Sequence, residues 1–168
     1  MAAPSSSEGS QVKVLIAYYS WQGHTAKVAQ ALAGTLGAEL VRIEPVSESG
    51  MLVKAAKAVL GLKSAIRPCR VDLAGVDHLV IASPVWAHRV PPYVNEYLSM
   101  VTGGAGKPFS VLVEMRASGA GSATGAIRQA LEKKGMRFVA SASTREEQVE
   151  NGTFGDRITA LAEAIRKG

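Results

Sequence analysis

The sequence predicts an α/β fold, a three-layer sandwich in which a parallel sheet of five strands lies between two layers of helices. Apolar, β-branched runs alternate along the chain with amphipathic helical patterns, which is typical of a parallel sheet covered on both faces. The first run, Val12 to Tyr18, is continuous, as expected of a strand buried on both sides. The length of 168 residues is that of one domain.

The first half of the chain contains two strands around a helix. The run from Val12 to Tyr18 is followed by a short polar turn. Apolar residues then recur at helical spacing from Thr25 to Leu36, and Gly37 ends that helix. Glu39 to Ile43 is a second, weaker strand.

The second half continues the alternation. Leu79 to Ala82 is the third strand, and Pro91 and Pro92 open the helix that follows it, because proline is tolerated in a first turn. The remaining elements are a fourth strand (Phe109 to Val113), a loose segment (Gly119 to Gly125), a helix that carries Ile127, Ala130 and Leu131 and ends at Gly135, a fifth strand (Phe138 to Ala142) and a closing helix (Phe154 to Ile165).

Composition excludes several classes of protein. Charged residues make up 20% and hydrophobic residues 47%, which is ordinary for a globular protein. The lone cysteine, Cys69, rules out an intrachain disulfide and a cysteine-rich zinc site. We expect residues 1–11 to form a disordered tail without the features of a signal peptide, and residues 12–168 to form a single cytoplasmic domain without a transmembrane segment.

The net charge of +5 gives only a weak indication of a partner. The basic residues are spread through the chain and aromatics are only 5%, which argues against nucleic acid binding. The segment from Met51 to Leu62 is basic and moderately amphipathic. We interpret it as the crossover helix between the second and third strands. The alternative is a peripheral contact with anionic lipid or an acidic partner.

The loop after the first strand has the chemistry of an anion site. Residues 20–25 read Ser-Trp-Gln-Gly-His-Thr, which supplies two hydroxyls, an amide and a glycine directly before a helix N-terminus. It contains no Lys or Arg, so a phosphate monoester suits it better than a triphosphate with magnesium. A plain helix cap, the alternative, would need only one hydroxyl.

Two segments resemble the flavodoxin family. Ser20, Gly23 and Thr25 match its phosphate loop, Ser/Thr-x-Thr-Gly-x-Thr, and Gln22 replaces a threonine. The segment from Asp77 to Leu98, DHLVIASPVWAHRVPPYVNEYL, is similar to the third strand, flavin loop and following helix of flavodoxin-like proteins. The resemblance covers nearly all of the chain from residue 12 to residue 165. It implies the strand order 2-1-3-4-5 and FMN as the cofactor.

The resemblance also implies where FMN binds. The phosphate would lie on the first loop and the ring between the loops after the third and fourth strands, with Trp86 against the ring rather than packed in the core. The implied binding residues are Ser20, Trp21, Gln22, Gly23, His24 and Thr25 in the first loop, Pro84, Val85, Trp86, Ala87, His88 and Arg89 in the second, and Met115, Arg116, Ala117, Gly119 and Gly121 in the third.

The third loop differs from that of small electron carriers because it contains no aromatic residue. One ring face would then be open to a planar acceptor such as a quinone or nicotinamide, or FMN would bind weakly. If Arg89 and Arg116 point inward, they favour the anionic reduced flavin and make it less reducing. If they point into solvent, this effect disappears.

Other patterns are weaker. Gly119 and Gly121 resemble a loose dinucleotide fingerprint, with Arg145 placed to meet an NADP 2′-phosphate, but Thr124 occupies the third glycine position. The three histidines lack metal-ligand spacing, so no metal is expected. We therefore expect an FMN-binding redox protein with a partner protein or a small planar acceptor. The alternative is a binding or regulatory module of the same fold that has lost tight FMN. The sequence leaves the oligomeric state unknown.

Overall fold

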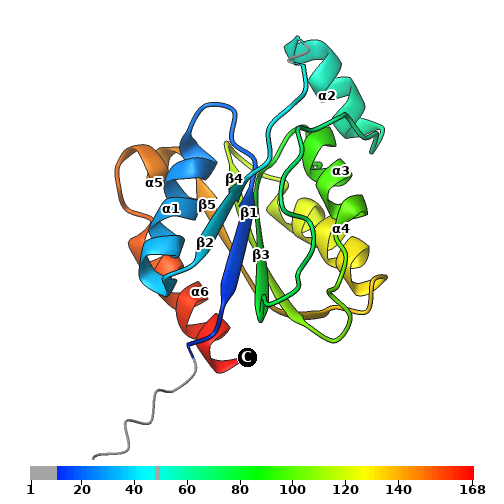
Figure 1. Ribbon diagram of the computed structural model, residues 1–168. Helices are drawn as coiled ribbons and strands as arrows, with labels where there is room; N and C mark the ends of the chain where they lie inside the picture. The colour runs from blue at the N-terminus through cyan, green and yellow to red at the C-terminus, as the bar shows by residue number, and fades with distance from the viewer. Residues whose placement is uncertain (1–10, 48–49) are drawn as a thin grey trace, which may run out of the picture.

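The computed structural model describes residues 11–47 and 50–168, and its sheet confirms the predicted fold class (Figure 1). Five parallel strands lie in the order β2-β1-β3-β4-β5. The strands are β1 (Val14–Tyr18), β2 (Glu39–Arg42), β3 (His78–Pro84), β4 (Pro108–Met115) and β5 (Arg137–Arg145). Apart from Gln11, the expected N-terminal tail lies outside the described residues.

Helices cover both faces of this sheet. They are α1 (His24–Leu36), α2 (Met51–Val59), α3 (Pro92–Met100), α4 (Ala120–Glu132), α5 (Glu146–Glu150) and α6 (Gly155–Lys167). Helices α1, α5 and α6 pack on one face, and α3 and α4 pack on the other (Figure 1).

The interior strand β1 shows why the sequence favours this arrangement. All five of its residues are buried. Successive side chains of a strand point to opposite faces. Leu15 and Ala17 accordingly belong to the α3–α4 core, whereas Val14 and Ile16 belong to the α1–α6 core. A continuous apolar run is therefore the pattern that two cores require.

The C-terminal third differs from expectation in three places. Strand β5 continues to Arg145 rather than ending at Ala142, because it stays paired with β4 as far as Met115. The five-residue helix α5 was not predicted. The segment expected to be loose is helical from Ala120, because Gly119 adopts the left-handed conformation of a helix cap and the small residue Ala123 packs into the core.

Helix α2 does connect β2 to β3, as expected of the crossover segment, but it contributes little to covering the sheet. It stands away from the body of the protein, and its main contact among the described helices is with α3 (Figure 1). The chain that follows covers the sheet instead: Leu73 and Val76 are buried in the α3–α4 core, and the Arg70 carbonyl accepts a hydrogen bond from the Tyr97 hydroxyl at 3.0 Å.

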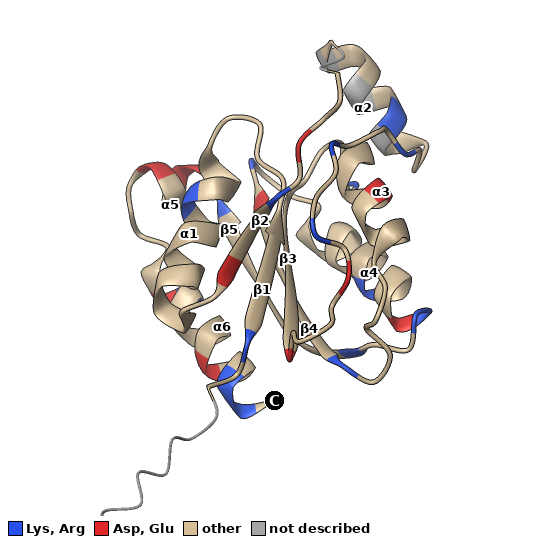
Figure 2. Cartoon of the chain, in the orientation of Figure 1, with Lys and Arg blue, Asp and Glu red and all other residues tan. Residues whose placement is uncertain are grey.

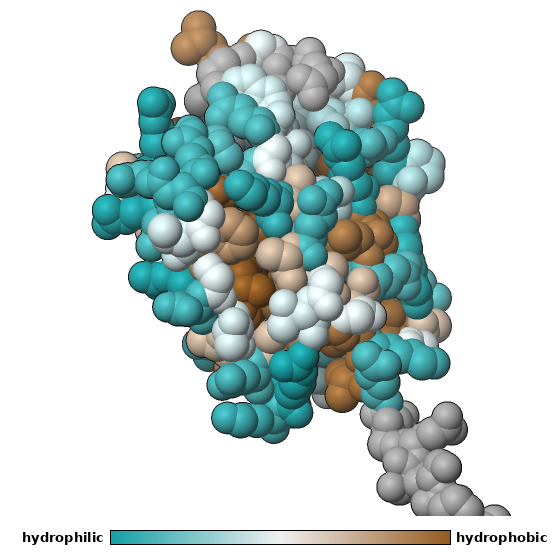
Figure 3. Space-filling view, turned by 90° about the vertical axis from the view of Figure 1, so that its left-hand side faces the viewer, coloured by the Kyte–Doolittle hydropathy of each residue, from teal (hydrophilic) through white to brown (hydrophobic). Residues whose placement is uncertain are grey.

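The segment that contains α2 exposes apolar side chains beside basic ones. Leu52 is 87% exposed and Leu60 is 70% exposed. Apolar atoms are visible at this end of the molecule in Figure 3. Residues 51–70 contain Lys and Arg but no Asp or Glu, as Figure 2 shows for the described part. Contact with anionic lipid or an acidic partner remains a prediction. No helix among the described residues is long and apolar enough to span a bilayer.

A buried histidine begins β3. His78 is 1% exposed, and its Nε2 lies 3.0 Å from the Ser110 hydroxyl. Burial, assisted by the positive charge of Arg137, lowers the His78 pKa to about 4. The imidazole is therefore neutral at physiological pH, whereas in the unfolded chain it takes up a proton near pH 6.5.

This difference predicts acid sensitivity. Between these two pH values the unfolded chain binds a proton at His78 that the folded protein does not bind. The free energy of unfolding therefore falls as the pH drops from about 6.5 to about 4, by up to about 3 kcal/mol. In His78→Gln this contribution should disappear, and denaturant unfolding between pH 4.5 and 7 should show a flatter pH profile. His88→Asn, which removes an exposed histidine, should keep the profile of the natural chain. Equal slopes in all three proteins would contradict this assignment.

Candidate functional site

The loops after β1, β3 and β4 meet at the carboxyl end of the sheet, where the chain reverses its direction of winding between β1 and β3. Ligands of open parallel sheets bind in such crevices. A cavity of about 50 Å³ lies there, lined by Ser20, Trp21, Gln22, His24, Thr25, Pro84, Trp86 and Glu114. All of these except Glu114 are predicted cofactor contacts, and the structure brings them together.

The first loop opens toward this cavity and leaves the start of α1 without a side-chain cap. Gly23 is the N-cap residue, with a φ of 94°, and no side chain hydrogen-bonds the helix end there. The Ser20 hydroxyl instead accepts a hydrogen bond from the Gly23 amide at 3.1 Å. A Cβ added at Gly23 would meet no atom within 4 Å. The amide donors and positive dipole of the thirteen-residue helix α1 therefore suit an anion.

The second loop is a tight two-residue hairpin turn. The Trp86 amide donates to the Arg89 carbonyl at 2.9 Å, and the Arg89 amide donates to the Trp86 carbonyl at 2.8 Å. The central residues Ala87 and His88 have φ values of 47° and 61°. Such turns normally carry glycine or asparagine at these positions. The loop is therefore strained, and it is held by its own hydrogen bonds.

Trp86 belongs to an aromatic cluster. Its ring meets Tyr19 edge-on at 5.4 Å, Trp21 at 6.0 Å and Tyr93 at 6.4 Å between centroids. Tyr19 and Tyr93 are buried, whereas Trp86 is partly exposed and packs against the core. Trp86 thus packs against the core and lines the cavity at the same time.

Glu114, at the end of β4, is not among the residues that the sequence predicts to bind the cofactor. The structure places it in the cavity. Burial raises the pKa of its carboxyl, and the nearby charge of Glu146 adds to the rise. His24 and a hydrogen bond with the Thr25 hydroxyl act in the opposite direction. Thr144, its partner in register on β5, has a buried hydroxyl without a hydrogen bond among the described residues.

His24 lies between two acids of α5. Its Nδ1 is 4.0 Å from Glu146, and its Nε2 is 3.6 Å from Glu150. Acidic residues gather on α5, which lies beside the start of α1 (Figure 2). The contacts of His24 with Glu146 and Glu150 were not predicted, because the sequence pattern did not indicate helix α5.

The third loop lies against the second. A Cβ at Gly119 would come within 2.8 Å of the His88 Cα, so glycine is required for this approach. The Arg116 side chain is 92% exposed and lies 3.6 Å from Glu146, and Arg89 is also exposed. Of the two alternatives for Arg89 and Arg116, this arrangement favours the one in which both side chains point into solvent. Gly121 lies in α4 and lines another cavity beside β5, so the structure does not bring it to the first loop.

The family model of NADPH-dependent FMN reductases matches residues 11–149. The chain belongs to that family. Family membership makes it an FMN-binding, flavodoxin-like redox protein. A search of curated proteins finds no match.

Solved structures agree with the fold of this FMN reductase family member. A flavoprotein from Lactobacillus acidophilus, crystallised in complex with FMN, is 19% identical, with a TM-score of 0.69 over 83% of this chain and 97% of that one. Flavodoxin 2 from Bacillus cereus is 20% identical, with a TM-score of 0.63 over 93% of this chain and 99% of that one. At these identities the likeness establishes the fold.

The residues of the cavity fit an FMN phosphate. Uncapped amides, the Ser20 and Thr25 hydroxyls and the Gln22 amide are neutral donors, and burial raises the pKa of the Glu114 carboxyl, which reduces its tendency to carry a charge that would repel a phosphate. The small cavity has the size of a phosphate rather than of a whole nucleotide. The ring would therefore have to lie outside it, next to Trp86.

A glycine substitution at Ala87, which has a positive φ, tests whether the turn of the second loop is strained. Ala87→Gly should raise the free energy of unfolding by about 1 kcal/mol, because glycine adopts a positive φ without a steric penalty. Ala160→Gly, the same change on the exposed side of α6, should lower it by about 1 kcal/mol. Urea denaturation measures both, and a loss of stability in Ala87→Gly would refute the strained turn.

Removal of the buried acid tests the environment of Glu114. Its raised pKa means that the folded protein retains a proton that the unfolded chain releases, so Glu114 reduces stability as the pH rises above about 4.5. Glu114→Gln should therefore gain stability relative to the natural chain as the pH rises from 4 to 8. Exposed Glu163→Gln provides the control, and denaturation curves at both pH values give the measurement. A constant difference between Glu114→Gln and the natural chain would exclude the raised pKa.

Proposed function

We propose that the three loops at the carboxyl end of the sheet hold FMN, with the phosphate on residues 20–25 and the ring between residues 84–89 and 115–119. The uncapped start of α1, which opens on the cavity that Trp86 lines, carries this proposal. When bound, FMN supplies the redox chemistry, accepting a hydride or single electrons and passing them on.

The chain's own residues bind and orient the cofactor. Gly23 allows the backbone to turn around the phosphate, and Ser20 fixes that turn through its hydrogen bond with the Gly23 amide. Trp86 excludes water from the ring, while Tyr19 and Tyr93 fix its orientation. Glu114 and Thr25 form a buried polar floor beneath the phosphate.

The acceptor is a small planar molecule such as a quinone, and the electron donor is a reduced nicotinamide nucleotide. The third loop supports this, because residues 115–119 contain no aromatic side chain to cover the second ring face. The alternative function is an electron carrier, which would take its electrons from a redox partner protein and would not oxidise a nicotinamide nucleotide itself. Consumption of NADPH by the FMN-loaded protein separates the two. We place this activity in the cytoplasm, in keeping with a single free cysteine.

Loss of the hydroxyl donors should weaken FMN binding. In the double variant Ser20→Ala, Thr25→Ala, the dissociation constant for FMN should rise at least tenfold, because each hydrogen bond to a charged group contributes about 1.5 kcal/mol or more. Thr35→Ala, whose hydroxyl bonds within α1, is the control and should bind FMN like the natural chain.

Quenching of FMN fluorescence on titration into the apoprotein measures these affinities. Equal affinity in the double variant would place the phosphate elsewhere. No binding of FMN by the natural chain at millimolar concentration would favour a protein that keeps the fold without the cofactor.

A further inference from the structure

The exposed apolar side chains of this protein are concentrated in the segment that contains α2. Of the ten large apolar side chains that are exposed in the described part of the chain, six lie between residues 46 and 62. Four of the six, Leu52, Val53, Val59 and Leu60, belong to α2 or to the turn that ends it. Single exposed apolar residues are ordinary, whereas such a concentration indicates an interaction surface.

These four side chains lie on one face of the helix. Leu52 and Val59 are seven residues apart, as are Val53 and Leu60, and seven residues make about two helical turns. Exposed Ala56 lies between the two pairs. All four large side chains remain half exposed or more although α2 contacts α3. We call residues 52, 53, 56, 59 and 60 the apolar stripe.

Contacts at the base of the segment hold the helix in its position. Pro45 and Ile66 form an antiparallel bridge. Beside it, the Arg67 amide donates a hydrogen bond to the Glu44 carbonyl at 2.7 Å. The chain that leaves the body of the protein is therefore joined to the chain that returns, and α2 is presented at one end of the molecule (Figure 1).

Basic residues accompany the apolar stripe. Between Glu48 and Asp72 the sequence contains three lysines, two arginines and no acid. Lys63 and Arg67 are exposed, and no red colour appears on the described part of residues 51–70 in Figure 2. The surface that meets the stripe must therefore tolerate or attract positive charge.

The basic character continues onto the body of the protein. Lys63 lines a groove of about 480 Å³ together with Lys133 and Lys134, and this groove lies between the end of the α2 segment, α3 and α4. None of the described residues that line it is acidic. The positive surface is therefore wider than α2 alone.

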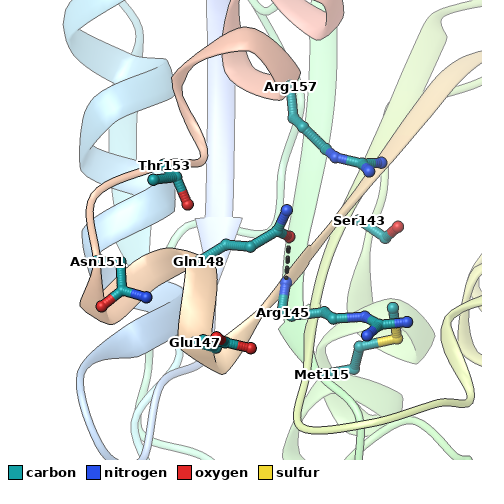
Figure 4. A pocket seen from close by; sticks show the side chains of 8 residues that line it. All are labelled: Met115, Ser143, Arg145, Glu147, Gln148, Asn151, Thr153 and Arg157. Carbon is teal, nitrogen blue, oxygen red and sulfur yellow. Dashed lines mark hydrogen bonds between the residues drawn. The ribbon is translucent and has the colours of Figure 1, made fainter.

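The charge disfavours a second copy of this chain as the partner. A two-fold interface through the apolar stripe would bring two basic, acid-free segments together, and like charges repel. A small ligand is disfavoured by shape. It would fit a hollow such as the cavity of about 430 Å³ beyond the end of β5, whose lining includes Arg145 and Arg157 and is polar except for Met115 (Figure 4).

The residue types of the stripe favour a lipid surface over an acidic protein. Protein interfaces depend on Trp, Tyr and Arg anchors, and Leu and Val are under-represented among their strongest contacts. The stripe contains only Leu, Val and Ala. Aliphatic side chains on one side of a helix, with lysine and arginine beside them, are typical of helices that lie in the interface of an anionic bilayer.

We propose that the α2 segment binds the surface of an anionic phospholipid bilayer. The apolar stripe enters the boundary between headgroups and acyl chains, and Lys63 and Arg67 meet the lipid phosphates. The contact is peripheral, because the nine residues of α2 are too few to cross a bilayer. It does not depend on the proposed function, since the stripe lies outside the three cofactor loops.

Flotation of the full chain with phospholipid vesicles tests this proposal. The chain should bind vesicles of phosphatidylcholine with about 40% phosphatidylglycerol at least tenfold more strongly than vesicles of phosphatidylcholine alone. Raising the salt concentration to about 0.5 M should weaken the binding severalfold, because salt screens the attraction between the basic residues and the lipid. The measurement needs no FMN and no turnover.

Paired variants test the apolar stripe. Leu52→Ser combined with Leu60→Ser should weaken binding to the anionic vesicles at least tenfold, because two aliphatic side chains no longer leave water. Val12→Ser combined with Met100→Ser is the control. These two side chains are 42% and 39% exposed and lie outside the segment, so this variant should bind like the natural chain.

A second pair of variants tests the charge without changing the stripe. Lys63→Gln combined with Arg67→Gln should weaken binding about tenfold, since each cation near an anionic membrane contributes to affinity. Lys13→Gln combined with Lys167→Gln removes the same charge from exposed sites outside the segment and should bind within about twofold of the natural chain. Thermal unfolding of each variant checks that it is folded.

Two results would overturn the proposal. One is equal binding to charged and uncharged vesicles, or equal binding by all four variants. The other is no vesicle binding by the natural chain. In that case, self-association that is lost in Leu52→Ser, Leu60→Ser would assign the stripe to a second copy of this chain, and a monomer in ultracentrifugation would assign it to an acidic protein.

Discussion

The parallel pairing of β1 with β3 is the constraint on which the site depends. β2 and β3 lie on opposite sides of β1, so the connections that leave β1 and β3 diverge and open a crevice between them. The Tyr19 amide continues this pairing past the end of β1, with a hydrogen bond to the Ala82 carbonyl at 3.2 Å. The hydroxyl loop and the Trp86 loop therefore stand side by side as a direct result of sheet register, which both cores fix by burying β1 completely.

The crevice at the carboxyl end of the sheet and the surface beyond β5 differ in their charge. At the crevice, uncapped amides and hydroxyls surround a carboxyl that burial biases toward its protonated form, and the exposed Arg116 is turned toward α5. Permanent positive charge is found instead beyond β5, at Arg145 and Arg157. Preorganised dipoles can bind an anion without a formal positive charge beside it.

Much of this could be predicted from local sequence, and the exceptions have physical causes. The parallel sheet and the two-sided burial of β1 follow from apolar runs, whereas the strand order and the first two loops follow from the resemblance of residues 20–25 and 77–98 to the flavodoxin family. Helix α5 was missed because five residues with two leading glutamates carry too few apolar positions to show a period. The role of Glu114 was missed because a single acid at a strand end looks exposed until α1 covers it, and the start of α4 was missed because glycine and serine favour loops in isolation.

The segment that contains helix α2 packs little against the sheet, so its length and sequence are weakly constrained. Its segment leaves the body of the molecule after β2, and the chain that returns to β3 provides the packing that a crossover helix normally provides. Since the entropy of closing a loop grows only slowly with its length, this segment can be lengthened, shortened or replaced at little thermodynamic cost to the sheet. It stands at the same end of the sheet as the cofactor loops (Figure 1). The segment that contains α2 can therefore differ in length or sequence while the sheet and the three loops at its carboxyl end keep their geometry.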